Sequence, residues 1–255
     1  MPMVKAIIVD MEGVVRDSRN AFHHAYEYAL SSVGLRLNSY PAETWKLRGY
    51  QEFNSLRNFL KLIYALSKSN EDITKVFWKK HVTEYLNGVM KEHVPPREIV
   101  DAMEANHLRF LMSPRTMRRI PPVRAGKIGV KLFKEDGLPV GVLTNSQKKY
   151  NDAWIEHKKM QDHFDLVVCS EEVGSPKPAP DGILAVCEKM KVKPKDAIYA
   201  GDTEADIIAA VKAGCMPIGI MSGGTDRKTL RALGATYVFD DLTDFALWHR
   251  RGGKP

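Results

Sequence analysis

Two carboxylates stand near the start of the chain, just past a short apolar segment. Asp10 and Glu12 follow residues 4–9, which are almost wholly apolar and partly β-branched. This pattern is typical of a strand that is buried on both faces of a parallel sheet. In open α/β sheets the carboxyl ends of the strands form the ligand-binding edge. A carboxylate placed there can act as a nucleophile, and a second one can act as a general acid and base.

Three more groups of polar residues also follow predicted strands along the chain. These groups are Thr144-Asn145-Ser146, Lys177 within the proline-rich loop 174–180, and the acidic pair Asp202 and Asp206. Parallel strands bring their carboxyl ends to one edge of a sheet, so we expect the groups to converge. They would place a hydroxyl, an amide, a cation and two further acids beside the first carboxylates.

This combination fits phosphoryl transfer through a covalent intermediate. Asp10 could attack phosphorus, while Lys177, the Thr144 hydroxyl and backbone N–H groups bind the phosphate oxygens. A Mg²⁺ ion held by Asp10 and Asp202 would neutralise charge, because Mg²⁺ favours one or two carboxylates together with phosphate and water. Glu12 could protonate the leaving alcohol and then activate the hydrolytic water.

Each of these residues also has a simpler interpretation when taken alone. An aspartate after a strand is often a turn former, a threonine a helix cap and a loop lysine a surface residue. The acidic spacing over 202–206 resembles the start of a calcium-binding loop, but Ile207 and Ala213 occupy the places of its glycine and closing glutamate. The occurrence of all four groups in order, each after its own strand, favours a shared site.

A long region without a convincing strand separates the first carboxylates from the other groups. In residues 19–115 apolar side chains recur three and four positions apart, which indicates amphipathic helices. Beyond this region helices and strands alternate, which indicates right-handed crossovers and a parallel sheet. The sequence predicts an α/β protein: a Rossmann-like doubly wound parallel sheet core, residues 1–18 and 116–255, with an inserted all-helical cap domain, residues 19–115.

The expected elements can be given as ranges. The strands are 4–9, 139–143, 166–168, 197–200, 218–220 and 237–239, and the helices of the insert are 21–33, 56–66, 71–89 and 97–110.

The composition is that of an ordinary globular protein with an excess of positive charge. The formal net charge is +7, but basic residues are spread among acidic ones, so we expect no nucleic-acid partner. No apolar stretch approaches the ~18 residues of a membrane span, and the N-terminus lacks a secretory pattern. Cys169, Cys187 and Cys215 lack metal-type spacing, which indicates buried thiols in a reducing compartment. We expect a cytoplasmic protein, monomer or homodimer, without a membrane partner.

The four polar groups together resemble the motifs of the haloacid dehalogenase superfamily. The matching segments are Asp10-Met11-Glu12-Gly13-Val14, Leu143-Thr144-Asn145-Ser146, Lys177-Pro178-Ala179-Pro180 and Gly201-Asp202-Thr203-Glu204-Ala205-Asp206. The helical insert resembles the cap of the phosphoglycolate-phosphatase-like subgroup. The resemblance covers nearly the whole chain and implies a Mg²⁺-dependent phosphatase acting on a small phosphorylated metabolite.

The resemblance also implies roles for individual residues, with Asp10 as the nucleophile and Glu12 giving its backbone carbonyl to the metal. The implied catalytic residues are Asp10, Glu12, Thr144 and Lys177; the phosphate-binding residues are Thr144, Asn145, Lys177 and Gly13; the metal site is Asp10, Glu12, Asp202 and Asp206. Asp206 is expected either at the metal or beside it. Possible substrate contacts are Lys46, Arg48 and Arg57 in the insert and Arg16 after the nucleophile.

Glu12 departs from the common family pattern, which has Asp at this position. The longer side chain moves the carboxyl group by roughly one bond, and a misplacement of about 1 Å can cost on the order of 100-fold in rate. Enolase-phosphatases, a branch of the same superfamily, use Glu there. Two alternatives stay open: a phosphomutase with the same residues, and a catalytically silent binding or regulatory protein. A haloacid dehalogenase is disfavoured, because it needs no metal and has no use for the second acidic pair.

The expected role of Glu12 gives a first prediction. Replacing Glu12 with Gln should slow the release of phosphate from the enzyme more than it weakens Mg²⁺ binding, because only the backbone carbonyl of residue 12 is expected at the metal. Phosphate release and Mg²⁺ titration, measured on the same preparation, check this. An equal loss of both would show that the side chain itself binds the metal.

Overall fold

The computed structural model describes residues 4–253 and divides the chain into two compact units. The core unit comprises Met1–Ser18 and Ile120–Pro255, and the helical unit comprises Arg19–Arg119. The second boundary falls after residue 119 rather than after residue 115 as the sequence predicted. The reason is that a short helix, α7 (Pro114–Arg119), follows α6 (Arg97–Leu111) and belongs to the helical unit.

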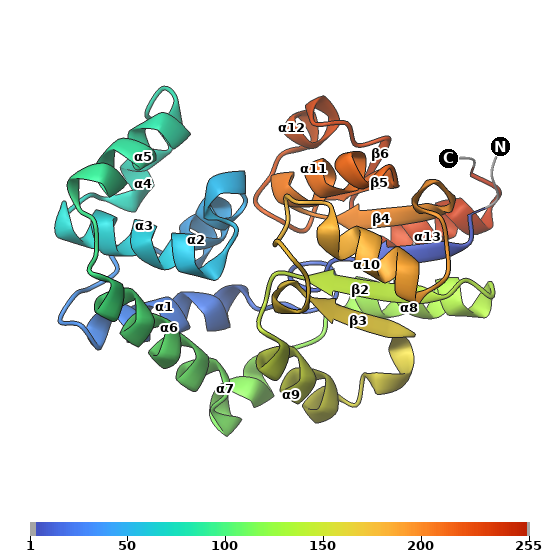
Figure 1. Cartoon of the computed structure of the whole chain (residues 1–255), viewed down its shortest axis with the longest axis horizontal. Helices are drawn as coiled ribbons and strands as arrows, with labels where there is room; N and C mark the ends of the chain where they lie inside the picture. The colour runs from blue at the N-terminus through green and yellow to red at the C-terminus, as the bar shows by residue number, and fades with distance from the viewer. Residues whose placement is uncertain (1–3, 254–255) are drawn as a thin grey trace. The chain divides into compact units, whose positions relative to one another are not determined.

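The core unit is built on a six-stranded sheet with the strand order β3-β2-β1-β4-β5-β6 (Figure 1). The strands are β1 (Ala6–Val9), β2 (Val140–Thr144), β3 (Leu166–Cys169), β4 (Ala197–Gly201), β5 (Met216–Ile220) and β6 (Tyr237–Phe239). All neighbours pair in parallel, and every residue of β1, β2 and β4 is buried. The predicted parallel sheet is confirmed, and its strand order reverses at β1, which lies between β2 and β4.

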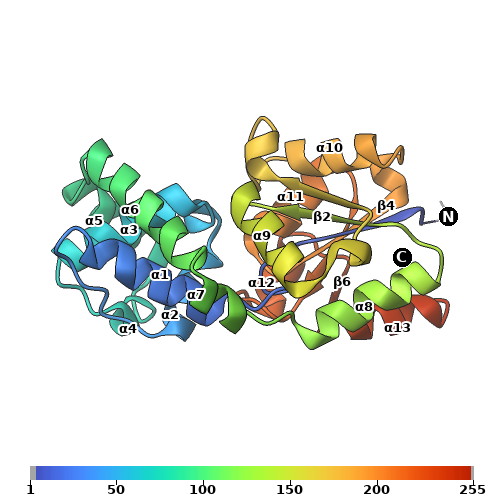
Figure 2. The same ribbon diagram turned by 90° about the horizontal axis from the view of Figure 1, so that it is seen from below.

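Helices cover both faces of this sheet. Figure 2 shows α10 and α11 on one face and α8 and α13 on the other. The helices of the core unit are α8 (Arg124–Glu135), α9 (Lys148–Lys158), α10 (Asp181–Lys189), α11 (Glu204–Ala213), α12 (Arg227–Ala232) and α13 (Leu242–Arg250), with short 3-10 turns η2 (Gln161–His163), η3 (Ser170–Glu172) and η4 (Pro194–Asp196). Side chains from four strands, Ile8, Leu143, Val168 and Tyr199, pack against Ile183, Val186, Ala209 and Ala210 of α10 and α11.

The helical unit contains more helices than the sequence pattern indicated. Besides α6 and α7 it holds α1 (Arg19–Ser31), α2 (Pro41–Arg48), η1 (Gln51–Phe53), α3 (Leu56–Lys68), α4 (Ile73–Val76) and α5 (Val82–Glu92). The prediction of one helix over 71–89 is wrong, because His81 has φ 55° and separates α4 from α5. The pattern also missed α2, in which Pro41 takes the first position and Glu43 Oε2 accepts a hydrogen bond from Tyr40 N at 2.5 Å.

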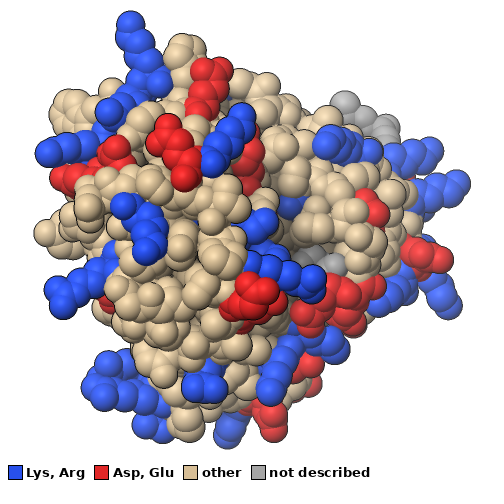
Figure 3. All heavy atoms as spheres, turned by 60° about the vertical axis from the view of Figure 1, so that its left-hand side comes forward, with Lys and Arg blue, Asp and Glu red and all other residues tan. Residues whose placement is uncertain are grey.

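The surface and the helices show how charged and apolar residues are distributed. On the face shown in Figure 3, lysine and arginine side chains are spread among acidic ones instead of forming one basic patch. Within residues 4–253, no helix has both the length and the apolar character needed to cross a membrane.

Helices α8 and α13 pack so closely that a glycine is required between them. A Cβ on Gly129 of α8 would lie 2.6 Å from the Leu242 carbonyl oxygen at the start of α13. We therefore expect Gly129→Ala to lower the free energy of unfolding by about 1–3 kcal/mol. Gly88 of α5 is a matched control, because nothing lies within 4 Å of its Cβ position and Ala there should stabilise by about 0.5–1 kcal/mol. Urea unfolding of both variants tests this; equal effects would contradict the close packing.

Candidate active site

Asp10 lies where the strand order reverses, directly after β1. Its backbone N–H donates to Ala200 O of β4 at 2.9 Å. The residue is 4% exposed, and its Oδ1 lies 2.5 Å from Lys177 Nζ. Burial, with a smaller contribution from the nearby charge of Asp206, raises the pKa of Asp10 to about 7 in spite of the opposing charge of Lys177. A cation added beside Asp10 would therefore favour its nucleophilic, charged form.

Lys177 reaches the same place from the loop before α10, and it is also buried. Its Nζ donates to Asp10, to Asp206 Oδ1 at 2.6 Å and to Tyr199 Oη at 3.0 Å. Burial by itself would lower the pKa of Lys177, but the two carboxylates outweigh burial and raise it, so the ammonium stays charged. Asn145 holds the main chain of Lys177: its Oδ1 accepts from Lys177 N and its Nδ2 donates to Lys177 O, both at 3.0 Å.

Asp206 fixes this cluster to the start of α11, where both of its carboxylate oxygens accept hydrogen bonds. Oδ1 accepts from Lys177 and, at 2.8 Å, from Tyr199 Oη. Oδ2 accepts from Asp202 N at 3.2 Å and from Thr203 N and Oγ1 at 3.0 and 2.6 Å. Burial would raise the pKa of Asp206, but Lys177 and these hydrogen bonds outweigh burial and lower it. Asp206 is thus a charged support for Lys177.

Tyr199 is the member of this cluster that the sequence did not indicate. It lies on β4 beside Ile8 of β1, on the face of the sheet that α10 and α11 cover. Burial and the charge of Asp206 raise the pKa of Tyr199 well above its ordinary value, so its hydroxyl remains a donor. A tyrosine in an apolar strand is usually a core residue, and nothing in the sequence separates this one from that role.

Asp202 differs from Asp206 because neither of its carboxylate oxygens has a hydrogen-bond partner within the described part of the chain. It is fully buried, and it offers an oxygen within 4.8 Å of oxygens of Asp10 and Asp206. Burial and the charges of these two acids raise the pKa of Asp202 well above its ordinary value. An unpartnered carboxylate among other acids needs a cation to compensate its burial, and carboxylate oxygens suit Mg²⁺. The residues therefore fit a divalent cation.

A glycine-rich loop after β5 covers this carboxylate. A Cβ on Gly223 would lie 2.4 Å from the backbone oxygen of Asp202 and 2.8 Å from its Oδ2. The loop therefore approaches Asp202 as closely as a glycine permits.

Glu12 is held by Arg16, which follows the first motif, and by Ser146 of the second motif. Arg16 Nε donates to Glu12 Oε2 at 3.1 Å, and Arg16 Nη2 donates to Glu12 Oε1. Ser146 Oγ, two residues after the end of β2, donates to Glu12 Oε1 at 2.7 Å. The Arg16 side chain is fully buried and turned toward Glu12, and its suggested role as a substrate contact stays a prediction.

Thr144 and Gly13 also take part in the local backbone structure. Thr144 is the last residue of β2, next to β1, and its buried hydroxyl accepts from Ser146 N at 3.1 Å. Gly13 has φ 81° and donates its N–H to Arg16 O at 2.8 Å, so it shapes the turn after Asp10. Phosphate contacts of Thr144, Asn145 and Gly13 stay predictions.

The basic residues suggested in the helical unit have partners within that unit. Arg57 pairs with Asp101 and Glu104 of α6 at 2.5 and 2.8 Å. Lys46 Nζ lies 4.2 Å from the ring centroid of Phe77. The Arg48 guanidinium lies 5.5 Å from the ring centroid of Phe59, and the role of these three residues as substrate contacts stays a prediction.

Comparison with known proteins shows which family part of the chain resembles. The sequence model of haloacid dehalogenase-like hydrolases matches residues 115–220, which include the second, third and fourth motifs. This part of the chain is similar to haloacid dehalogenase-like hydrolases. It is 34% identical to the phosphoglycolate phosphatase of Escherichia coli (strain K12) over 108 residues, 42% of this chain and 43% of that relative. The match thus spans less than half of the relative's length.

Two further similarities extend over more of the chain. The phosphoglycolate phosphatase of Aquifex aeolicus (strain VF5) is 26% identical over 211 residues, 83% of this chain and 82% of that protein. The crystal structure of a predicted phosphoglycolate phosphatase from Haemophilus somnus 129PT has a TM-score of 0.76 at 18% identity and covers 98% of this chain and 99% of its own. This structural similarity shows that the fold is shared, including a region equivalent to the helical insert.

The unpartnered carboxylate of Asp202 predicts a link between metal binding and the stability of this protein. The pKa of Asp202 is higher in the folded chain than in the unfolded chain, so near neutral pH the unfolded chain binds fewer protons than the folded one. Its contribution therefore lowers the free energy of unfolding as pH rises from about 4 toward the raised pKa. We expect Asp202→Asn to raise the melting temperature of the Mg²⁺-free protein at pH 8 by about 2 °C or more, with a smaller gain at pH 5.

The same variant should lose the stabilisation that Mg²⁺ gives to the parent protein, because bound ligands stabilise only the state that binds them. Differential scanning fluorimetry at pH 5 and 8, with and without Mg²⁺, measures both effects. The matched control is Asp162→Asn at an exposed position, which should behave as the parent. A melting temperature of Asp202→Asn that still rises with Mg²⁺ as in the parent would contradict the assignment.

Proposed function

We propose that this protein is a Mg²⁺-dependent phosphatase that hydrolyses a small phosphate monoester through an aspartyl-phosphate on Asp10. The observation that carries the proposal is the buried cluster of Asp10, Lys177 and Asp206 beside the unpartnered Asp202. The relatives reported above are named as phosphatases, which supports the reaction class. The substrate we propose is a small phosphorylated metabolite.

In the first step an oxygen of Asp10 attacks phosphorus and the ester bond to the leaving alcohol breaks. Lys177 is fixed by Asp206 and Tyr199, so its ammonium is already in place to neutralise phosphate oxygens. Thr144 and backbone N–H groups after β2 are proposed to bind the same oxygens. Glu12 gives a proton to the alcohol as it leaves.

In the second step water attacks the phosphorus of the aspartyl-phosphate, and Asp10 is released. Glu12, which lost its proton in the first step, accepts a proton from this water. The proposed metal ligands are the side chains of Asp10 and Asp202 with the backbone carbonyl of Glu12. Asp206 is proposed to support the site without binding the metal, because its oxygens already accept hydrogen bonds. When bound, Mg²⁺ would screen the negative charge of the phosphate and of the carboxylates.

The helical unit is proposed to act as a cap that selects the substrate and excludes water. We further propose that the protein works in the cytoplasm, where its thiols stay reduced. Cys169, Cys187 and Cys215 are buried and form no disulfide, which supports a reducing compartment. A phosphomutase remains the alternative within the same chemistry.

The proposed reaction is tested with p-nitrophenyl phosphate. We expect turnover that requires Mg²⁺ and falls by at least about 1000-fold in Asp10→Asn, because the amide cannot replace the carboxylate as nucleophile. Asp162→Asn, an exposed aspartate of the same unit, is the matched control and should keep full activity. Turnover that survives Asp10→Asn would contradict the covalent mechanism.

A panel of phosphorylated metabolites then separates phosphatase from phosphomutase. Inorganic phosphate released in step with the free alcohol supports hydrolysis. Phosphate that reappears on another hydroxyl of the substrate would show a phosphomutase instead.

A further inference from the structure

Arg16 is fully buried in the core unit, and its guanidinium forms a fork with Glu12 through Nε and Nη2. We propose that Arg16 is a positioning residue that fixes the Glu12 carboxylate in the place from which it serves the reaction. This inference rests on the proposed function, in which Glu12 is the general acid and base. Arg16 itself touches neither phosphate nor metal in this proposal; it acts through Glu12.

The backbone after Asp10 brings Arg16 and Glu12 together. Residues 11–16 form a tight turn in which Arg16 N donates to Met11 O and Gly13 N donates to Arg16 O, both at 2.8 Å. Gly13 makes this turn possible with φ 81°. The turn folds the chain back on itself, so that a side chain four positions later lies alongside the Glu12 carboxylate.

Helix α9 holds the other side of the guanidinium. Arg16 Nη2 donates to Asn151 Oδ1 at 2.7 Å, and the guanidinium carbon lies 4.1 Å from the ring centroid of Tyr150 and 5.1 Å from that of Trp154. These contacts leave the guanidinium little freedom to rotate. Arg16 is therefore a rigid support rather than a mobile surface cation.

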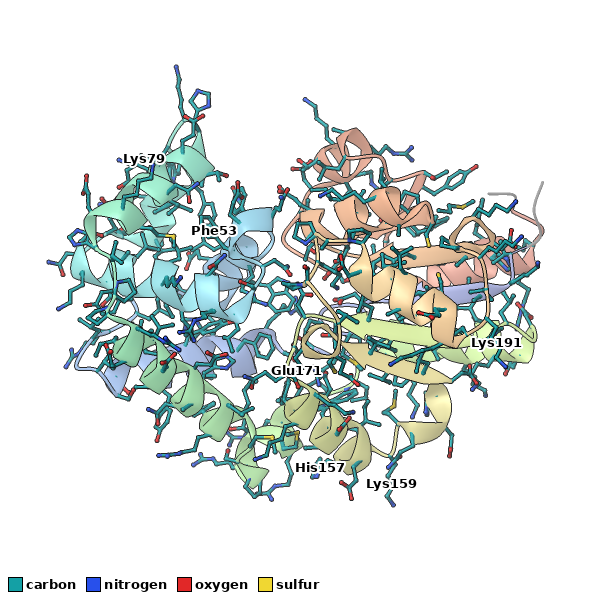
Figure 4. The ribbon with its side chains drawn as sticks, in the orientation of Figure 1. Phe53, Lys79, His157, Lys159, Glu171 and Lys191 are labelled. Carbon is teal, nitrogen blue, oxygen red and sulfur yellow. The ribbon has the colours of Figure 1, made fainter. Side chains whose placement is uncertain are left out.

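Asn151 also connects this support to the second contact of Glu12. Its Nδ2 donates to the backbone oxygens of Ser146 and Gln147 at 3.0 and 2.9 Å, while Ser146 Oγ donates to Glu12 Oε1 at 2.7 Å. Glu171 is labelled in Figure 4. Its Oε1 accepts a hydrogen bond from Lys148 N at 2.7 Å, which fixes the start of α9. Arg16 and Ser146 thus both donate to the Glu12 carboxylate, and Asn151 contacts both of these donor residues.

Arg16 explains how the longer glutamate can serve at position 12, where aspartate is common in the family that the sequence resembles. A two-pronged arginine binds both oxygens of a carboxylate in a defined plane, which removes the freedom that the longer side chain adds. A contribution to folding stability does not explain the presence of Arg16, because a buried ion pair can often be replaced by apolar residues of similar volume without loss of stability. The contacts of Arg16 with both oxygens of Glu12 point instead to a role in placing the carboxylate.

The first experiment compares four variants by steady-state hydrolysis of p-nitrophenyl phosphate with Mg²⁺. Arg16→Met should lower kcat by about 10–100-fold with KM changed less than about threefold, because a carboxylate misplaced by about 1 Å costs rate rather than binding. Arg16→Lys should restore part of kcat through a single donor. Adding Arg16→Met to Glu12→Gln should cost less than about threefold beyond Glu12→Gln alone, because the two residues act as one unit.

The matched control is Arg250→Met, which removes another arginine fork of the core unit. Arg250 Nε lies 2.9 and 3.1 Å from the two oxygens of Asp136, and residue 136 precedes β2, at the sheet edge opposite to the motifs. This variant should keep the kcat of the parent. If Arg16→Met lowers kcat as much in the Glu12→Gln background as in the parent, Arg16 acts independently of Glu12 and the inference is overturned.

A second experiment leaves Arg16 in place and shortens its partner. Glu12→Asp restores the residue that is common in the family, yet we expect its kcat to fall at least about 10-fold, because the shorter carboxylate cannot keep both arginine contacts and the Ser146 contact. A Glu12→Asp variant as active as the parent would overturn the inference.

A crystal structure of Arg16→Met gives a readout that does not depend on turnover. We expect the Glu12 carboxylate to leave its position 2.7 Å from Ser146 Oγ; an unmoved carboxylate overturns the inference even if the parent shows no activity. Failure of the proposed function can be distinguished from failure of this inference. In that case the parent protein would show no turnover that depends on Mg²⁺ and Asp10.

Discussion

A lysine ammonium buried between two carboxylates is the interaction on which the site depends. A charge removed from water must be compensated, and Lys177 is compensated by Asp10 and Asp206, with Tyr199 as a third contact. With Asp202 the site holds three carboxylates for one ammonium, so it keeps an excess of negative charge. This excess is why the residues suit a divalent cation and why the metal-free site contains carboxyl groups with raised pKa values.

The parallel sheet makes this cluster possible. Its strand order reverses at β1, so the residue after β1 has strand ends on both sides, one followed by the start of α9 and the other by the start of α11. The helical unit is inserted between β1 and β2, so the chain leaves and re-enters the core unit close to the site. There Asp17 N donates to Pro121 O at 3.0 Å and Val123 N to Val15 O at 2.7 Å. The two connecting segments are thereby joined by backbone hydrogen bonds.

Carboxylates of similar chemistry receive different roles here from their surroundings. Asp206 accepts hydrogen bonds on both oxygens and supports Lys177, whereas the two carboxylate oxygens of Asp202 have no hydrogen-bond partner within residues 4–253 and are left for a cation. Glu12 is partly exposed and held by an arginine and a serine. A single type of group thus serves as a support, a candidate metal ligand and a candidate acid and base.

The sequence by itself determined the parallel sheet, the helical insert and the residues that end the strands, because these follow from apolar patterning and from local polar groups. It did not determine where the helical pattern of residues 71–89 is interrupted. The left-handed backbone conformation of His81 does not change the spacing of apolar residues, so the sequence pattern could not reveal it. Nor could it separate Asp202 from Asp206, assign Tyr199 to the cluster or pair Arg16 with Glu12. Those outcomes depend on which side chains meet across β4, α9 and the turn after β1, and only the tertiary structure brings those distant segments into contact.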